Sequence, residues 1–247
     1  MTKQLRRQII WGLVLILLSC VLYAAQVGIF HAERDTFFYL FQDLAFVPIQ
    51  LLLVTVIVDQ VLRMRERMAL LKKLNMVIGV FFSEVGTGLL RHFIVFDAEA
   101  AGVRDQFQFK TSWDDKQFAR AIETVRAHAV TMDHARGDLG ALKEFLVSKR
   151  GFLLNLLENQ SLLEHDTFTD LLWAVFHLME ELDQRQDVSA LSHTDGEHIA
   201  GDIKRAYVVL LTEWLSYLRH LKSDYPYLYS LAVRTNPFDP GATVNVK

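Results

Sequence analysis

The 247-residue chain has room for one or two domains and combines 51% hydrophobic residues with 22% charged residues. Its net charge of -3 is too small to indicate a nucleic-acid partner, so none is expected. A single cysteine, Cys20, excludes an intrachain disulfide and a cysteine-based zinc site.

The first hydrophobic segment, Ile9 to Phe30, contains no Asp, Glu, Lys or Arg. As a helix it would be roughly 33 Å long, enough to cross a hydrocarbon core of roughly 30 Å. Because Lys3, Arg6 and Arg7 precede it, a cleaved signal peptide is the alternative. The hydrophobic run is longer than that of most signal peptides, and no small-residue cleavage site ends it. The sequence therefore predicts an uncleaved membrane span at about residues 9–30.

The second hydrophobic segment covers residues 37–61, with its core at Leu44 to Val58. Pro48 interrupts it, but a proline is tolerated in a membrane helix when neighbouring groups satisfy the freed backbone. With the first segment it predicts a transmembrane hairpin in residues 1–62. The alternative for the second segment is a hydrophobic core helix.

Basic residues flank the predicted hairpin on one side. Three precede the first span, and the connecting loop has only Arg34, among acidic residues. Because Lys and Arg are kept on the cytoplasmic side, both termini are expected in the cytoplasm, with the lipid bilayer of the cell membrane as a partner. The basic residues after the second span are a topology determinant or a site for anionic lipid: Arg63, Arg65, Arg67, Lys72 and Lys73.

Residues 63–96 are predicted to form a basic juxtamembrane stalk followed by an apolar helix. Asn75 occupies one position of a short coiled-coil seam, which is too short to indicate a dedicated oligomerisation device. Val85-Gly86-Thr87-Gly88 resembles a potassium-channel filter, but a filter lies between two spans and this stretch follows both. The apolar seam positions are Val61, Met64, Met68, Leu71 and Ile78.

Residues 97–234 show helical periodicity and are predicted to form a cytoplasmic helical bundle. Ser112 to Asp115 resembles a capping box for a first helix that runs through Met132. A second helix is expected over 139–158. The fold class is therefore all-α, an N-terminal two-helix transmembrane hairpin followed by a cytoplasmic helical bundle.

Two more helices and a tail complete the predicted chain. Thr167 is expected to cap the third helix, and the fourth carries an apolar stripe from Ile199 to Leu221. Residues 235–247 are expected to be an extended tail that docks through Phe238. Nearby aromatic residues either fill the bundle or form a partner-binding surface: Tyr217, Tyr225, Tyr227 and Tyr229.

The fourth helix carries the candidate metal ligands His198, Asp202, Glu213 and His220 along one flank of its apolar stripe. The spacing allows His198 and Asp202 to share an ion. Glu213 and His220 are seven residues apart, about 10 Å along a helix, so each needs partners from another helix. The candidate partners are Glu84, His92 and His134. The alternative is that these residues are hydrogen-bonded at the core boundary.

A further pair, His177 and Glu181, also has ligand spacing, but it lies nearly opposite the leucine stripe of its helix. It is interpreted as a solvated surface pair.

The chain lacks Gly-x-Ser-x-Gly, Gly-x-x-x-x-Gly-Lys and Gly-x-Gly-x-x-Gly, so no enzyme class or cofactor is indicated. The first hypothesis is a membrane-anchored helical scaffold or sensor that acts through a protein partner or through self-association as a homo-oligomer. The alternative is a metal-binding helical-bundle enzyme or metal sensor at the membrane. A channel component is a third hypothesis, but the two spans carry no pattern of charged pore-lining residues.

Overall fold

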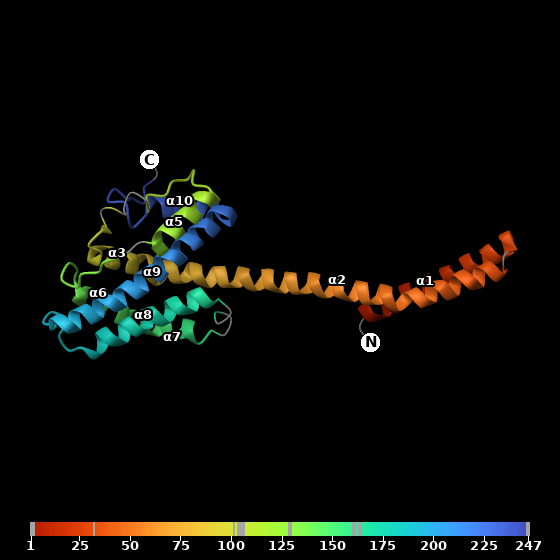
Figure 1. Ribbon diagram of the computed structural model, residues 1–247, viewed down its shortest axis with the longest axis horizontal. Helices are drawn as coiled ribbons and strands as arrows, with labels where there is room; N and C mark the ends of the chain where they lie inside the picture. The colour runs from red at the N-terminus through yellow and green to blue at the C-terminus, as the bar shows by residue number, and fades with distance from the viewer. Residues whose placement is uncertain are drawn as a thin grey trace. The chain divides into compact units, whose positions relative to one another are not determined.

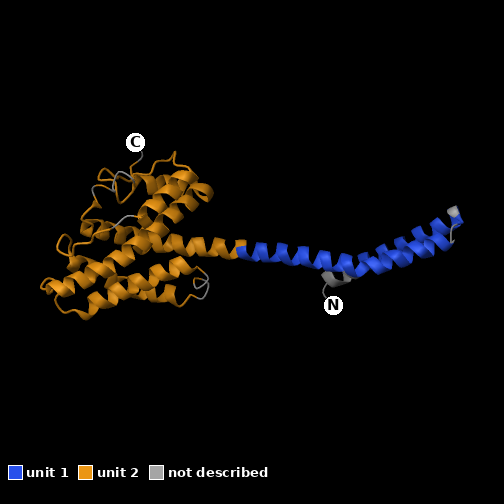
Figure 2. Ribbon diagram, in the orientation of Figure 1, with its two compact units in different colours: residues 1–67 blue, residues 68–247 orange. Residues whose placement is uncertain are grey.

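The computed structural model describes residues 3–31, 33–100, 102, 107–127, 130–159, 162 and 165–245. Contacts between Cα atoms divide the chain into unit 1, Met1–Arg67, and unit 2, Met68–Lys247 (Figure 2). Within the described residues every regular element is a helix, and the only β pairing is an isolated bridge between Asp97 and Met132. The all-α prediction is confirmed.

Unit 1 consists of helix α1, Lys3–Phe30, and helix α2, Glu33–Phe81, up to Arg67 (Figure 1). His31 lies between them with φ 51°, a left-handed conformation, and α2 continues through Pro48. Two stretches are long and apolar enough to cross a membrane, Ile10–Ile29 and one within Arg34–Phe96, and neither is buried in the protein.

The end of α2 belongs to the core of unit 2. Leu74, Ile78 and Phe81 are buried at helical spacing, and the chain continues into the π-helix η1, Phe82–Gly86, and helix α3, Thr87–Phe96. Residues from Leu74 onward pack into the same core as the later helices, so the apolar helix expected in the second part of 63–96 is a core helix of unit 2. The seam positions Val61, Met64, Met68 and Leu71 are exposed.

The π-helix has a local cause in its side chains. The Thr87 backbone N–H donates to the Phe82 carbonyl, five residues back, and the Thr87 hydroxyl donates to the same oxygen at 2.9 Å. A Cβ on Gly86 would lie only 2.5 Å from the Phe82 ring, so glycine permits this close packing. The filter-like stretch thus lies in the packed core of unit 2.

Helix α5, Asp115–Ala127, begins at a capping box, but one formed by Asp114 and Gln117. Each side chain accepts a 2.8 Å hydrogen bond from the backbone N–H of the other residue. The predicted box, which starts at Ser112, lies two residues too early. The predicted continuation to Met132 is also wrong, because Met132 forms the bridge to Asp97; Ala129 lies outside the described residues.

The helix predicted over 139–158 is two helices, α6, Leu139–Ser148, and α7, Arg150–Leu157, separated at Lys149. Helix α8, Asp166–Gln184, is capped by His165, whose ring accepts from the Phe168 N–H. The prediction that Thr167 caps this helix is wrong.

Helix α9, His193–Asp224, is the central element of unit 2 and packs against α3, α5, α8 and the last helix, α10, Pro226–Arg234 (Figure 1). Its expected apolar stripe is buried, including Ile203 and Trp214. Phe238 is buried against Phe107 and Trp214, as predicted for the C-terminal segment. The C-terminal tyrosines do not share one environment, since Tyr229 is buried in the core and Tyr227 is exposed.

A candidate metal centre between α8 and α9

Helices α8 and α9 lie side by side in opposite directions. His177 faces Asp202, and four residues further along α8 Glu181 faces His198, four residues earlier on α9. Arg185, which follows α8, holds the junction because its guanidinium donates to both carboxylate oxygens of Asp195 on α9, at 3.0 and 2.6 Å. The two helices therefore meet in a defined register.

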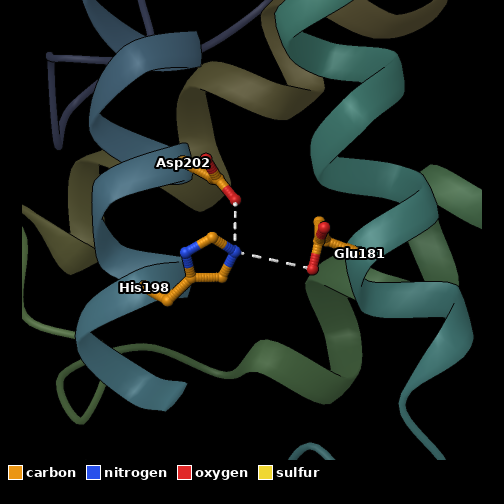
Figure 3. Close-up of side chains that lie close together, drawn as sticks. All are labelled: Glu181, His198 and Asp202. Carbon is orange, nitrogen blue, oxygen red and sulfur yellow. Dashed lines mark ion pairs between the residues drawn. The ribbon is translucent and has the colours of Figure 1, made fainter. Parts of the chain in front are cut away.

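Two imidazoles and two carboxylates alternate around this junction. On α8, His177 Nε2 lies 3.9 Å from Glu181 Oε1, and on α9, His198 Nε2 lies 3.4 Å from Asp202 Oδ2. Between the helices, His177 Nε2 lies 3.5 Å from Asp202 Oδ2, and His198 Nε2 lies 3.6 Å from Glu181 Oε2. Figure 3 shows the imidazole of His198 between the two carboxylates. We call these four residues the α8–α9 cluster.

Asp202 is the buried member of the α8–α9 cluster, with a side chain only 3% exposed. Its Oδ1 accepts a 2.9 Å hydrogen bond from Arg205 Nη1. Its Oδ2 is buried and has no hydrogen-bond partner, although both imidazoles face it. Leaving a buried polar atom unsatisfied costs about 1–3 kcal/mol, and more for a charged group. This oxygen therefore has the surroundings of a ligand atom.

Arg185 lowers the pKa of two carboxylates at the junction, those of Glu181 and Asp195. The hydrogen bond from Arg185 lowers the pKa of Glu181, whose Oε2 lies 2.7 Å from Arg185 Nη1; partial burial opposes this effect. The same guanidinium lowers the pKa of Asp195 by hydrogen bonding. The two carboxylates in turn raise the pKa of Arg185, and the hydrogen bond that Arg185 donates to Asp195 is the larger cause. Arg185 also orients Glu181 from outside the cluster, as hydrogen-bonded groups around metal ligands do.

Three members of the α8–α9 cluster have the composition and spacing of a metal site. Ligand atoms of Glu181, His198 and Asp202 all lie within 4.8 Å of one another, the only such group of three or more among the described residues, and His177 is not part of it. Its donors are neutral imidazole nitrogen and carboxylate oxygen, which suit Zn²⁺ and other first-row divalent ions. The arrangement can bind such an ion and thereby tie α8 to α9.

Of the four predicted metal ligands, two lie in contact with each other and two lie elsewhere. His198 and Asp202 lie together, as their spacing predicts. Glu213 is buried elsewhere on α9. His220 contacts Asn75 at 3.3 Å and Asp224 at 3.2 Å through its Nδ1. Neither Glu213 nor His220 belongs to the metal-ligand group found among the described residues.

The proposed partner residues for Glu213 and His220 also lie in other surroundings. Glu84 forms an ion pair with Lys149, and His92 packs against the ring of Phe145. His134 lies against the start of α9, where a Cβ on Gly196 would be 2.3 Å from its Nε2.

His177 and Glu181 are the cluster residues that sequence reasoning assigned to the solvated surface. The four-residue spacing of this pair matches that of His198 and Asp202, and the repeated His-x-x-x-carboxylate pattern was the available signal. His177 is 46% exposed, so its position away from the leucine stripe is observed. Helix α9 nevertheless covers that flank of α8, which the stripe alone does not reveal.

Two family models match the chain. One, described as "Uncharacterized protein MJ1433, C-terminal helical domain", matches residues 70–234, and the other, "MJ1433, N-terminal helical domain", matches residues 2–62. The Methanocaldococcus jannaschii protein MJ1433 is 42% identical over 234 residues, which cover 95% of this chain and 94% of the relative. The chain belongs to the MJ1433 family. No solved structure matches it.

The MJ1433 family match places the described geometry within one domain. All four residues of the α8–α9 cluster lie in the part that matches the MJ1433 C-terminal helical domain. The exposed apolar helix α1 lies in the part that matches the N-terminal helical domain.

Proposed function

We propose that this MJ1433 family protein is a membrane-anchored helical sensor whose C-terminal domain binds a divalent metal ion at the α8–α9 cluster. The observation that carries the proposal is Asp202 Oδ2, a buried carboxylate oxygen without a hydrogen bond that two imidazoles face. Binding is relayed through association with a protein partner or a second copy of the chain.

The charges of the junction support a cation. Glu181, Asp195 and Asp202 contribute three negative charges, and Arg185 and Arg205 contribute two positive ones. Because a histidine binds a metal ion in its neutral form, these five residues leave one net negative charge at the junction when the histidines act as ligands. A divalent ion supplies both the missing charge and the missing partner, and a buried charge is retained in proteins when it is paired or coordinates a metal.

The surface of unit 1 supports a membrane anchor. The side chains of the α1 stretch Ile10–Ile29 are not buried by the rest of the protein. Each large aliphatic or aromatic side chain gains about 1.5–3 kcal/mol when it leaves water, so a helix that is apolar all round is stable in lipid. Because basic residues flank the two apolar stretches on the same side, the proposed topology has two spans with both termini in the cytoplasm.

Metal content of the purified protein tests the sensor proposal. The full-length chain, carrying a tag without histidine, is extracted in mild detergent, equilibrated with a mixture of divalent ions and freed of excess metal. We expect stoichiometric metal in the wild type and little in Asp202→Asn, which keeps the acceptor for Arg205 but removes the charge. Glu123→Gln, an exposed carboxylate on α5, is the matched control and should retain the metal.

Two outcomes count against the proposal. The proposed sensor function is wrong if the wild-type protein is folded, as judged by circular dichroism, yet binds no more metal than Asp202→Asn. The proposed membrane anchor is wrong if an alkaline carbonate wash releases the protein from membranes without detergent. Chemical cross-linking with and without the bound ion then shows whether self-association responds to it.

A further inference from the structure

The structure points to a zinc site with four protein ligands, in which His177 completes the set formed by Glu181, His198 and Asp202. This inference rests on the proposed function and deepens it, since it names the ion and the full ligand set. We infer that Zn²⁺ is bound by two His-x-x-x-carboxylate pairs, one from each helix, and acts as a clasp between α8 and α9.

His177 lies close enough to the two carboxylates of the cluster to become a fourth ligand. Its Nε2 lies 3.5 Å from the buried Asp202 Oδ2 and 3.9 Å from Glu181 Oε1, so it already approaches both carboxylates of the cluster. Its imidazole is 46% exposed, so a small rotation of the side chain toward His198 meets little packing resistance. The same holds for His198, which is 53% exposed.

The separations between ligand atoms favour a tetrahedral ion. Two atoms that each lie about 2.0–2.2 Å from a tetrahedral zinc are about 3.3–3.6 Å apart. Three nitrogen–oxygen distances of the cluster lie in this range: His198 to Asp202 Oδ2 is 3.4 Å, His177 to Asp202 Oδ2 is 3.5 Å and His198 to Glu181 Oε2 is 3.6 Å. The fourth, from His177 to the other Glu181 oxygen, Oε1, is longer at 3.9 Å. Neighbouring ligands around an octahedral magnesium ion are closer, about 2.8–3.0 Å, and Mg²⁺ prefers oxygen ligands and bound water.

The chemical nature of the ligands also favours zinc. Two imidazole nitrogens favour Zn²⁺ and other late first-row ions over Mg²⁺ and Ca²⁺. Four protein ligands close a tetrahedral site, which is the arrangement of structural zinc sites. Outside the ligands, Arg205 bonds Asp202 Oδ1 and Arg185 bonds Glu181 Oε2, so both carboxylates are oriented by a second contact.

The ion would link α8 to α9 because its ligands come from both helices. Each helix contributes one imidazole and one carboxylate, so an ion bound by all four must hold α8 and α9 in their observed register. Because the ion binds only the folded arrangement, it raises the thermal midpoint of unit 2 in proportion to the logarithm of its free concentration.

The test compares ions and variants in the detergent-solubilised full-length chain. Affinities for Zn²⁺ and Mg²⁺ are measured by competition with a chromophoric chelator, and Co²⁺ serves as a spectroscopic probe, since tetrahedral Co²⁺ absorbs far more strongly in the visible than octahedral Co²⁺. We expect Zn²⁺ to bind at least about 100-fold more tightly than Mg²⁺. We expect His177→Ala to weaken Zn²⁺ binding at least about 100-fold, more than loss of an outer contact does, and to abolish the strong Co²⁺ band.

His193→Ala removes an exposed histidine of α9 and is the matched control, which should bind Zn²⁺ as the wild type does. Thermal unfolding without metal verifies that His177→Ala is folded, and His177→Gln provides a second variant. Zn²⁺ binding that is unchanged in both His177 variants, or equal affinity for Mg²⁺, overturns the four-ligand zinc site but leaves the proposed metal sensor standing. Wild-type protein that binds none of the three ions overturns both.

Discussion

Unit 1 and unit 2 contain the same kinds of apolar residue in opposite surroundings. In unit 1, Leu17 is 67% exposed and Phe41 is 74% exposed. In unit 2, Leu210 and Phe168 are fully buried. The apolar side chains of unit 1 are therefore left uncovered by the described residues, whereas those of unit 2 bury one another.

The difference lies in how apolar residues are distributed around each helix. The α1 stretch from Ile10 to Ile29 is apolar on all sides, whereas α8 and α9 carry an apolar stripe and a charged flank. A stripe directs a helix into a core, and uniform coverage favours lipid. The charged flanks of α8 and α9 are also where the metal-ligand candidates lie, so the pattern that builds the core leaves the site at its edge.

The largest expected effect comes from removing an aromatic ring from the core of unit 2, with removal of a ring from unit 1 as the comparison. Phe168→Ala deletes a ring that packs edge-on against Phe81 at 5.2 Å and should destabilise unit 2 by about 3–5 kcal/mol. Phe41→Ala should leave the same unfolding transition unchanged. Denaturant titration of the detergent-solubilised chain, followed by tryptophan fluorescence, measures both, since Trp113, Trp173 and Trp214 lie in unit 2. Equal losses in the two variants would contradict the contrast between the units.

A charge in the second apolar stretch has the next largest effect. Leu52→Arg places a cation near the middle of the proposed second span, which opposes insertion by about 2.5–3.5 kcal/mol. With only the first span inserted, the C-terminal domain changes sides. Fusions of the C-terminus to alkaline phosphatase and to a fluorescent protein in a bacterial host report its location, and Leu52→Ala is the control. An unchanged ratio of the two reporters in Leu52→Arg would argue that α2 does not cross the membrane.

Much of the fold of unit 2 could be predicted because helical periodicity is a local property. The expected stripes of α8 and α9 are buried, for example Leu171 and Val175 on α8 and Ile199 on α9. One error occurs where two neighbouring residues compete to cap the same helix. Thr167 is a good capping residue by type, yet the ring of His165 accepts the hydrogen bond.

The ends of helices and the π-helix depend on packing that periodicity does not encode. Val125 ends the buried face of α5, and Met132 pairs with Asp97 across the chain. Lys149 interrupts the expected long helix with φ -98° and ψ 2°, between two helices that each contact α8. Such breaks follow from fitting neighbouring helices together.

Half of the candidate site could be predicted from sequence because it lies within one helix. His198 and Asp202 meet through their four-residue spacing alone. The other half requires the register between α8 and α9, which is held by Arg185 and Asp195 across the connection. The contribution of His177 and Glu181 therefore could not be derived from the leucine stripe of α8.

The smallest expected effect is an acid dependence confined to unit 2. Arg185 lowers the pKa of Glu181 and of Asp195, so its ion pairs stabilise the fold above the range where free carboxyls titrate, and this contribution is lost as the pH falls through the lowered pKa values. Arg185→Met should therefore lower the thermal midpoint near neutral pH, and its difference from the wild type should shrink toward about pH 3. Arg126→Met, an exposed arginine at the end of α5, is the control and should show no such convergence. If the difference in thermal midpoint between the wild type and Arg185→Met instead stays constant or widens in acid, Arg185 stabilises the α8–α9 junction through packing of its side chain. The register of the two helices would then not depend on the carboxylates.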